Sequence, residues 1–567
     1  MGKEDADKIL SFLFKFRKGT YLMKKITKVI AAATALSAAL GVCAYAAEDT
    51  IEDKVIAGYQ AWFNTEGDGS PRNEWVHWGR PEVGHLTFDA YPDVRDYSVE
   101  DLKETYFAEL GNGEKSKLFS SYRAGVIDKH FEMMHDYGID GVAVQRFGSV
   151  TINGVEERFK NSVDILKNVK ASAEKHNELF YVMYDISGLS EENLVEDLKA
   201  DWQQVILNDL DITSSPSYAK DNGRPVVCLW GLGIREGTGE QYSELIDWFH
   251  DKGCYVIGGV SKSWRDQIAK DEAMEKAFCK LDMLSPWSVG SAKTDSDVDS
   301  DASILAADKA YLDEKGIAYQ PVMFPGFSWS NWKDNAVRNQ IPRRAGDFMW
   351  RQAYNIAKQD IHCGYIAMFD EYDEGTAILK LAEDSSMIPK DQYFITASAD
   401  GSYTSSDLYM RLAGYIPKVL RGEEEITEEM PLLLSEGPVY FRSGFEKYFD
   451  AQPVDGNGEL VKDELTYNGR YALKLNRVGG GGEMLTKLSE LDFSAEKINI
   501  GISAYLAGGS AELSVGLETA DGDVLYSDLS FANGKWTYNT LTDISVAGKN
   551  ITGLILKAKG TDDYKIY

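Results

Sequence analysis

The chain has 567 residues, of which 44% are hydrophobic and 26% charged, so it can bury a sizeable core and has a globular composition. Its length favours one large domain with a smaller one. With 60 Lys and Arg against 90 Asp and Glu, the formal net charge of −30 excludes nucleic acid as a partner and favours a neutral substrate, although surface acidity also serves solubility.

The N-terminal segment has the features of a secretory signal peptide. Met23-Lys24-Lys25 supplies positive charge, residues 26–46 are apolar and Ala-rich, and Ala44-Tyr45-Ala46 forms an A-x-A cleavage site. We therefore expect residues 1–46 to be an upstream extension and signal peptide of a secreted or cell-surface protein, with no membrane span after cleavage. The alternatives are lipidation at Cys43 and a retained anchor helix, which the short Ala-rich run argues against.

Short apolar runs then alternate with segments of helical periodicity. The runs are rich in β-branched and aromatic residues, and continuous apolar strands of this kind are buried on both faces, as in a parallel sheet. The predicted strands are 54–62, 141–146, 179–185, 225–230, 254–259, 283–286, 319–324 and 363–370. The predicted helices are 126–137, 163–176, 194–207, 242–250, 304–315, 348–359 and 407–420.

Eight strands that alternate with helices predict an α/β fold, a (β/α)8 TIM barrel, over residues 47–435. A doubly wound open sheet is the main alternative. No G-x-G-x-x-G follows the first strand, which argues against a dinucleotide-binding version of that fold.

Polar and aromatic residues stand at or beside the ends of most of these strands. In a TIM barrel the carboxyl ends of the strands form the catalytic face. The substrate-binding candidates on this ground are Trp62, Arg146, Tyr184, Asp185, Trp230, Trp287 and Asp370. Arg146 and Asp185 are expected either to bind hydroxyls or to pair with each other, and each tryptophan alone is more often a core residue.

Two long loops follow the first and the seventh strand. Residues 64–119 contain Trp75-Val76-His77-Trp78, and residues 325–339 contain Trp329. Long loops at the catalytic face usually build substrate sites, so His77, Trp78 and Trp329 join the substrate-binding candidates. For His77 a hydrogen-bonded structural role is an equal alternative.

A second domain is predicted from residue 436 to residue 567. After an acidic linker at 423–429 the pattern changes to alternating strands and Gly turns, at 471–475, 498–506, 511–517, 524–529 and 551–558. This pattern is typical of a β-sandwich. It stops abruptly at Tyr567, which leaves undecided whether the sandwich has one more strand. The sandwich is either a carbohydrate-binding module or a structural domain.

The sequence offers few other chemical motifs. The cysteines beyond the signal peptide are Cys228, Cys254, Cys279 and Cys363, and without a CxxC pair or a His partner at ligand spacing they predict free, mostly buried thiols and no zinc. G-x-S-x-G, Walker A and H-E-x-x-H are absent. We expect no metal and no cofactor.

Acidic residues crowd the end of the last predicted strand, in Asp370-Glu371-Tyr372-Asp373-Glu374-Gly375-Thr376. Like charges this close raise at least one pKa, and a raised acid beside an ionised base is what glycoside hydrolysis needs. Glu371 and Glu374 are therefore the catalytic candidates. The alternatives are a solvated acidic loop and a Ca²⁺ site, although the spacing matches no EF-hand.

The segment Glu371–Thr376 resembles the E-W-H-E-G-T motif of glycoside hydrolase family 99, the endo-acting α-mannosidases and mannanases. Gly58-Tyr59-Gln60-Ala61-Trp62-Phe63, Trp75–Trp78 and Tyr137–Phe147 also resemble family 99 and family 71-like bacterial proteins, and the resemblance spans about residues 53–420. Tyr372 and Asp373 replace the Trp and His of the motif, so the substrate can differ.

The resemblance implies a (β/α)8 fold, no essential metal, and retaining endo-cleavage of an α-mannosidic linkage through a 1,2-anhydro sugar. It implies that Glu371 deprotonates the substrate 2-OH, that Glu374 is the acid and base at the leaving oxygen, and that Tyr59 contacts the sugar. The sequence thus predicts a secreted glycoside hydrolase whose partner is a mannan or mannose-containing glycan. The alternative is a catalytically silent or differently specific protein that binds a xylan- or arabinan-type glycan.

Overall fold

The computed structural model describes residues 50–80, 85–434, 440–441, 443–445, 455–462, 464–467 and 470–567. The predicted signal peptide and Cys43 lie outside the described residues. Each of the two globular parts is described by itself.

The first part is built on a sheet of parallel strands in the order β10-β9-β8-β7-β5-β4-β1-β12-β11. The strands are β1 (Val55–Tyr59), β4 (Gly141–Phe147), β5 (Leu179–Asp185), β7 (Arg224–Leu232), β8 (Tyr255–Ser261), β9 (Met283–Trp287), β10 (Ala318–Tyr319), β11 (Val322–Met323) and β12 (Gly364–Ile366). A short strand, β6 (Lys220–Asp221), pairs antiparallel with β7. The strands are buried almost throughout, as their continuous apolar sequence predicts.

One segment of chain borders both ends of this strand order. Only Gln320 and Pro321 separate β10 from β11; Ala318 pairs with Met283 of β9, while Val322 pairs with Tyr365 of β12. The sheet therefore curls toward itself, and with its helices the domain is TIM-barrel-like.

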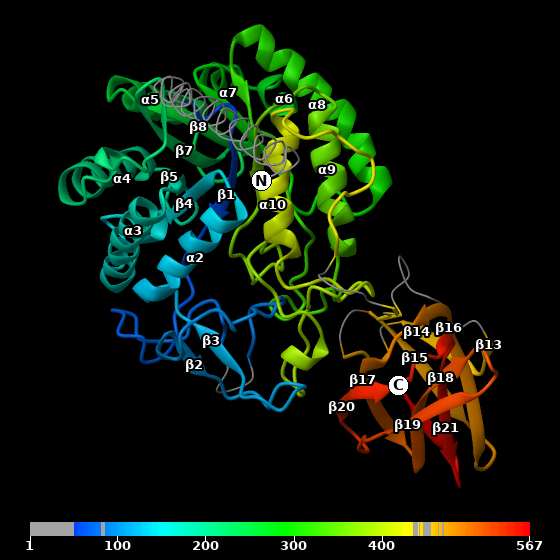
Figure 1. Cartoon of the computed structure of the whole chain (residues 1–567). Coiled ribbons are helices and arrows are strands. Elements are labelled where there is room, and N and C mark those ends of the chain that lie inside the picture. The colour runs from blue at the N-terminus through cyan, green and yellow to red at the C-terminus, as the bar shows by residue number, and fades with distance from the viewer. Residues whose placement is uncertain are drawn as a thin grey trace, which may run out of the picture. The chain divides into compact units, whose positions relative to one another are not determined.

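Helices follow the strands and lie around their outer side (Figure 1). They are α2 (Ala124–Tyr137), α3 (Glu156–His176), α4 (Leu194–Asp201), which continues into a π-helical stretch (Trp202–Asp209), α5 (Gly239–Asp251), α6 (Trp264–Ile268), α7 (Glu272–Phe278), α8 (Asp295–Lys315), α9 (Asp347–Ala357) and α10 (Leu408–Leu420). Thr238 and Thr294 begin α5 and α8 with capping boxes, which satisfy the free N–H groups at each helix start.

Every strand predicted for this domain overlaps an observed strand. The largest difference is β12, which ends at Ile366 rather than at residue 370. Beyond Ile366 the chain leaves the ladder and turns back, since the amide of Met368 donates to the carbonyl of Thr376 and that of Phe369 to Gly58. The acidic residues therefore lie on a turn and not on the strand itself.

The long loop after β1 carries a small hairpin of β2 (Leu102–Glu104) and β3 (Lys117–Phe119). Of the four cysteines in the described part of the chain, all are free thiols, and Cys228, Cys254 and Cys363 are buried as predicted. Within the described residues no helix is long and apolar enough to cross a membrane.

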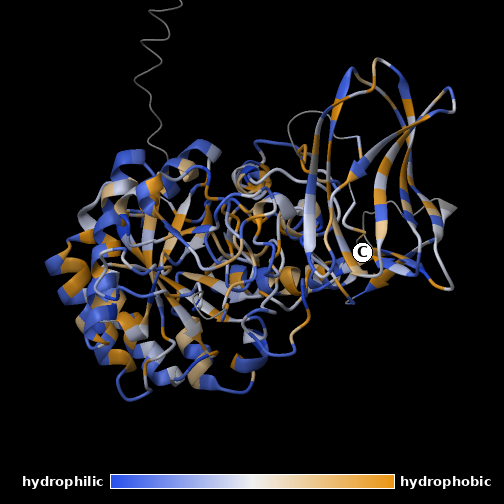
Figure 2. Ribbon diagram, turned by 90° about the horizontal axis from the view of Figure 1, so that it is seen from below, coloured by the Kyte–Doolittle hydropathy of each residue, from blue (hydrophilic) through white to orange (hydrophobic). Residues whose placement is uncertain are grey.

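The second part consists of two five-stranded antiparallel sheets, β13-β16-β21-β18-β19 and β14-β15-β22-β17-β20. The strands are β13 (Asp455–Gly456), β14 (Gly458–Lys462), β15 (Tyr471–Arg477), β16 (Gly482–Ser494), β17 (Lys497–Gly508), β18 (Ala511–Thr519), β19 (Val524–Leu529), β20 (Trp536–Ser545), β21 (Asn550–Gly560) and β22 (Tyr564–Ile566). Side chains from both sheets share one core, and hydrophobic and hydrophilic residues alternate along the strands (Figure 2). The sequence missed β13, β14, β16, β20 and β22. In β16 the period-two pattern is interrupted by irregularities after Lys487 and Glu490.

Candidate active site

The turn after β12, residues 370–377, holds the predicted catalytic pair. The amides of Thr376 and Ala377 both donate to the carbonyl of Glu371, at 3.0 and 2.9 Å. Gly375 has a φ of +62°, a conformation that side chains disfavour. Buried Arg343 donates to the carbonyls of Gly375 and Ala377, at 2.8 and 2.7 Å, and fixes the turn from outside. We name this segment the acidic turn.

The carboxylates of the acidic turn are buried. Glu371 is 5% exposed and Asp373 is 4% exposed, while Glu374 is half-buried. The alternative of a solvated acidic loop is therefore wrong. Among the described residues no cluster has the arrangement of a metal site.

Burial and mutual repulsion change the acidity of the turn. Burial raises the pKa of Glu371 well above its usual range, and the charges of Asp373 and Glu374 raise it further. Burial raises the pKa of Glu374 to about 7, against the charges of Lys333 and Arg235, which lower it. Oε1 of Glu371 and Oδ1 of Asp373 are buried without a hydrogen-bond partner in the described part of the chain. The turn thus binds protons at neutral pH and has free acceptor atoms.

Asp370 differs from its neighbours and does not face the site as predicted. Its side chain is fully buried, and its two oxygens accept hydrogen bonds from the amides of Gln60 and Ala61, both at 2.8 Å. Ala61 has a φ of +48°, so this carboxylate holds a strained backbone at the end of β1. Asp370 positions the chain and has no free atom for a sugar.

His77 lies against the acidic turn. Its Nδ1 is 2.7 Å from Oδ2 of Asp373, and its ring stacks on Trp62 at 3.6 Å with an 8° interplanar angle. Trp62 in turn stacks on Phe147 at 5.2 Å. Since 31% of the His77 side chain is exposed, this aromatic stack is partly open to a ligand.

The environment shifts the pKa of both members of the His77–Asp373 pair toward their uncharged forms. Burial, together with the charges of Arg72 and Arg158, lowers the pKa of His77 to about 3. Burial and the charge of Glu374 raise the pKa of Asp373 well above its usual range. One hydrogen bond joins Nδ1 to Oδ2, and Nε2, which bonds to no described residue, remains free to face a ligand.

Arg146 and Tyr184 do not reach the site. Both are fully buried, and Arg146 forms a two-bond ion pair with Asp201, from Nε at 2.6 Å and from Nη2 at 2.7 Å. The hydroxyl of Tyr184 donates to the same carboxylate at 2.8 Å. The expected pairing of Arg146 with Asp185 is wrong, because Arg146 points outward from the sheet toward α4.

Tyr59 and Trp78 are also core residues. The hydroxyl of Tyr59 bonds to Nδ1 of buried His130 at 2.9 Å, and the indole of Trp78 donates to the carbonyl of Phe119 at 2.9 Å. Neither side chain has any exposed surface. The sugar contact that the resemblance implies for Tyr59 is therefore not available to it in this structure.

Asp185, Trp230 and Trp287 lie at neighbouring strand ends. Asp185 accepts the amide of Ser187 at 2.8 Å, and burial raises its pKa. Trp230 and Trp287 meet edge to face at 5.2 Å, and Trp287 is half-buried. The indole nitrogen of Trp230 has no hydrogen-bond partner among the described residues. These three remain candidates for contact with a ligand.

The loop between β11 and α9, residues 325–341, carries Trp329 and Trp332, and we name it the aromatic loop. Buried Asp89 accepts hydrogen bonds from the hydroxyl of Ser328 at 2.6 Å, from the amide and hydroxyl of Ser330 at 2.8 and 2.7 Å, and from the amide of Asn331 at 2.7 Å. The amide of Ser328 also donates to the carbonyl of Glu374 at 2.8 Å. One carboxylate thus holds the aromatic loop beside the acidic turn.

Asp89→Ala is expected to raise KM for a cleaved glycan by roughly tenfold, with a smaller change in kcat, because the loop loses its anchor while the glutamates keep theirs. Steady-state kinetics measure this, and limited proteolysis of residues 325–341 reports the loosened loop. Asp93→Ala is the matched control, since Asp93 lies in the same long loop but pairs with Arg95 at 2.7 Å. Equal effects of both variants would contradict the assignment.

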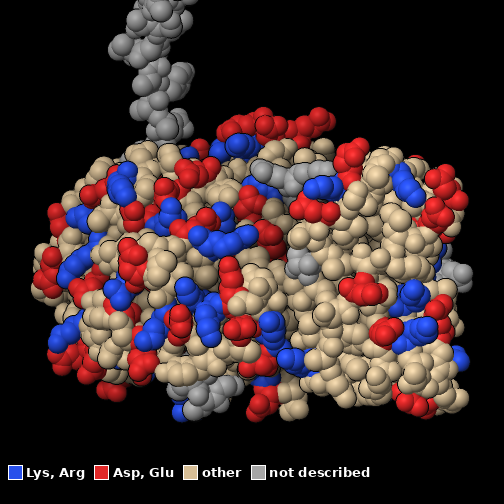
Figure 3. All heavy atoms as spheres, turned by 60° about the horizontal axis from the view of Figure 1, so that its bottom comes forward, with Lys and Arg blue, Asp and Glu red and all other residues tan. Residues whose placement is uncertain are grey.

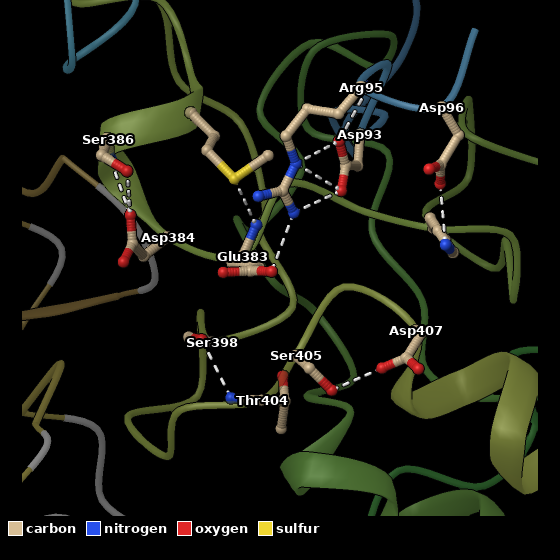
Figure 4. Close-up of polar contacts among 12 residues, drawn as sticks. Asp93, Arg95, Asp96, Glu383, Asp384, Ser386, Ser398, Thr404, Ser405 and Asp407 are labelled. Atoms are coloured by element: carbon tan, nitrogen blue, oxygen red, sulfur yellow. Dashed lines mark hydrogen bonds and ion pairs between the residues drawn. The ribbon is translucent and has the colours of Figure 1, made fainter. Parts of the chain in front are cut away.

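Ion pairs brace that long loop against the chain beyond the acidic turn. Arg95 lies between Asp93 and Glu383, 2.8 Å from Oε1 of Glu383, and Asp96 pairs with Lys380 at 2.7 Å (Figure 4). These ion pairs tie residues 93–96 to residues 380–383.

Sequence reasoning missed several residues that surround the acidic turn: Gln60, Phe147, Arg235, Lys333 and Asp373. Asp373 carried a signal, since it stands between the two glutamates. Arg235 and Lys333 carried none, because exposed basic residues in loops are common.

Comparisons with known proteins add only distant likenesses. No protein-family model and no curated protein matches the chain. Among solved structures it is similar to the GH99 endo-alpha-mannosidase from Bacteroides thetaiotaomicron in complex with BIS-TRIS-Propane, with 15% identity over 66% of this chain and 99% of that chain and a TM-score of 0.48. An endo-beta-1,4-mannanase double mutant from Cellulomonas fimi is similar at 11% identity over 73% of this chain and 86% of that one, with a TM-score of 0.32. These likenesses assign neither family nor activity, which must come from the site itself.

Proposed function

We propose that the protein is a glycoside hydrolase that uses Glu371 and Glu374. The observation that carries the proposal is the acidic turn: two glutamates three residues apart, with pKa values raised by burial and with the Oε1 atom of Glu371 free of any described partner. A buried acid beside a second carboxylate is the pair that glycoside cleavage needs. The half-buried aromatic rings of Trp287 and Trp329 offer apolar faces for sugar, whereas the ring of Trp62 is stacked on His77 and Phe147.

The family 99 resemblance supplies a route for this pair. Glu371 takes the proton of the sugar 2-OH, and the 2-oxygen attacks C1 while the C1–O bond breaks and the leaving oxygen takes the proton of Glu374. Glu374 then removes a proton from water, which attacks C1 while the bond between C1 and the 2-oxygen breaks, and the 2-oxygen recovers its proton from Glu371. The configuration at C1 is retained, and no enzyme nucleophile is needed.

The proposed substrate is an α-linked, mannose-containing glycan cleaved internally. His77 contacts a sugar hydroxyl through Nε2, while Asp185, Trp230, Trp287 and Trp329 supply further contacts. Asp373 differs from the histidine of the family motif and occupies the place beside His77, so the hydroxyl contacts differ from those of family members.

A panel of α-mannans, xylans, arabinans and N-glycans, followed by product sizing, tests the proposal. Oligosaccharide products from a mannan would support internal cleavage. Monosaccharides alone would overturn it, and binding without cleavage would favour the alternative of a silent carbohydrate-binding protein.

The activity is expected to fall as pH rises through about 7. The pKa of Glu374 in the folded protein is about 7, above its usual value, so the group is protonated below this pH and loses its proton above it. As the acid, Glu374 must carry that proton. A kcat/KM–pH profile, which reports the free enzyme, measures the basic limb, and a value that is flat from pH 6 to pH 9 would contradict the assignment.

We further propose export through residues 23–46, which N-terminal sequencing of the mature protein tests. A carbohydrate-binding role of the sandwich is a separate proposal. Its Trp536 is covered by Tyr467 and Tyr505, each with its ring 5.5 Å away, so this tryptophan does not supply an open platform. Deleting residues 437–567 and measuring retention on polysaccharide tests the binding role, and unchanged retention would remove it.

A further inference from the structure

Two exposed cations from different loops lie on tryptophan rings beside the acidic turn. Arg235, in the loop after β7, has its guanidinium carbon 5.5 Å from the ring centroid of Trp230. Lys333, in the aromatic loop, has its Nζ 4.0 Å from the ring of Trp332. The quadrupole of a tryptophan ring attracts a cation to its face, so both charges are held without a carboxylate.

Within the part of the chain that the structure describes, no Asp or Glu forms an ion pair with Arg235 or Lys333. Carboxylates are nevertheless in excess in this chain, 90 against 60 Lys and Arg. Over the face seen in Figure 3, basic and acidic groups are interspersed. The charges of both cations reach Glu374, since both lower its pKa, and neither cation is held in a salt bridge by a described residue, so both are available to a ligand.

Both cations oppose the role proposed for Glu374. Their charges lower its pKa, and Arg235 also lowers that of Asp185. They therefore favour loss of the proton that the leaving oxygen needs. An anionic group bound between them would neutralise both charges and let Glu374 keep its proton in the complex. The cations thus aid the reaction only when the substrate brings a negative charge.

We infer that the site takes a glycan with an anionic substituent, a carboxylate or a phosphate, which Arg235 and Lys333 bind beside the sugar whose linkage is cleaved. This inference rests on the proposed function and specifies its substrate class. The guanidinium fork of Arg235 suits either oxyanion, and Lys333 adds a point charge. The net charge of −30 disfavours a polyanion, but at physiological salt it is screened beyond about 8 Å, so it does not prevent binding of one anionic group by these two cations.

The test measures binding by calorimetry in the full-length Glu374→Gln variant, which separates affinity from turnover. The probes are two matched pairs: glucuronoxylan oligosaccharides before and after carboxyl reduction, and phosphorylated mannan oligosaccharides before and after dephosphorylation. We expect the anionic member of one pair to bind about tenfold more tightly than its neutral partner, and the pair that shows this identifies the anion.

Arg235→Met and Lys333→Met, each added to Glu374→Gln, are expected to remove most of that tenfold preference and to leave the neutral member unchanged. Lys315→Met is the matched control, because Lys315 is an exposed cation 5.4 Å from the ring of Tyr311 at the far end of α8. Equal binding of both members of each pair, or equal loss for anionic and neutral probes in the two variants, would overturn the inference.

The two proposals fail separately. Cleavage of neutral glycans by the wild type without any preference for the anionic probes overturns the inference and leaves the hydrolase standing. Selective binding of an anionic probe by a wild-type chain that cleaves none of the glycans overturns the hydrolase and leaves the preference for an anionic ligand standing.

Discussion

Glu374→Gln is expected to lower kcat/KM on a cleaved glycan by about 10²- to 10⁴-fold, the usual contribution of a positioned general acid. Glutamine keeps the shape of the side chain but has no proton to give at the leaving oxygen. The backbone of residue 374 stays fixed, since its carbonyl accepts the amide of Ser328 at 2.8 Å. Steady-state kinetics on the preferred glycan of the panel measure the loss.

A substrate whose leaving group needs no proton distinguishes the roles of the two glutamates. On the α-glycosyl fluoride of the cleaved sugar, Glu374→Gln is expected to keep a first burst of fluoride and to lose steady turnover, because water still has to be activated. Glu371→Gln is the matched control and is expected to lose the burst as well, since the 2-oxygen attacks only after deprotonation. Loss of the burst in both variants would contradict the division of roles, and full activity in both would remove the glutamates from the mechanism.

The strands of the first domain could be predicted because each is a continuous apolar run between polar segments. The runs at 179–185 and 225–230 correspond to β5 (Leu179–Asp185) and β7 (Arg224–Leu232) almost residue for residue. The acidic turn was also predictable, since carboxylates at the end of a buried strand have few structural uses. Its burial was not, because that depends on loops distant in sequence, including the one that carries His77.

Which strand-end side chains face the site could not be predicted from residue type alone. Successive residues of a strand point to opposite faces, so Tyr184 and Asp185 cannot both face a substrate. The same alternation separates Arg146, which lies against Asp201, from Phe147, which stacks beside Trp62. The candidates near strand ends therefore include core residues such as Tyr184 and Arg146, because residue type alone ignores the alternation of side chains along a strand.

Breaking the buried Arg146–Asp201 pair gives the largest expected loss of stability. Both side chains are fully buried, and Asp201 also accepts the hydroxyl of Tyr184 and the amide of Ile152. Arg146→Met leaves this carboxylate without its cation and is expected to lower the free energy of unfolding by about 3–5 kcal/mol, the usual cost of an uncompensated buried charge. Denaturant unfolding of the full chain, followed by tryptophan fluorescence, measures the change.

The double variant Arg146→Met with Asp201→Asn decides whether the loss comes from charge. Asparagine keeps one oxygen, which accepts the amide of Ile152, while its NH2 group can donate to the hydroxyl of Tyr184. It carries no charge, so the double variant is expected to recover most of the stability that the single variant loses. A loss in the double variant equal to the sum of the two single losses would show that packing, and not the buried charge, dominates. Because the pair lies on the outer side of the sheet, kcat/KM measured well below the unfolding temperature is expected to change by less than about threefold, whereas an arginine that bound a sugar hydroxyl would lose far more.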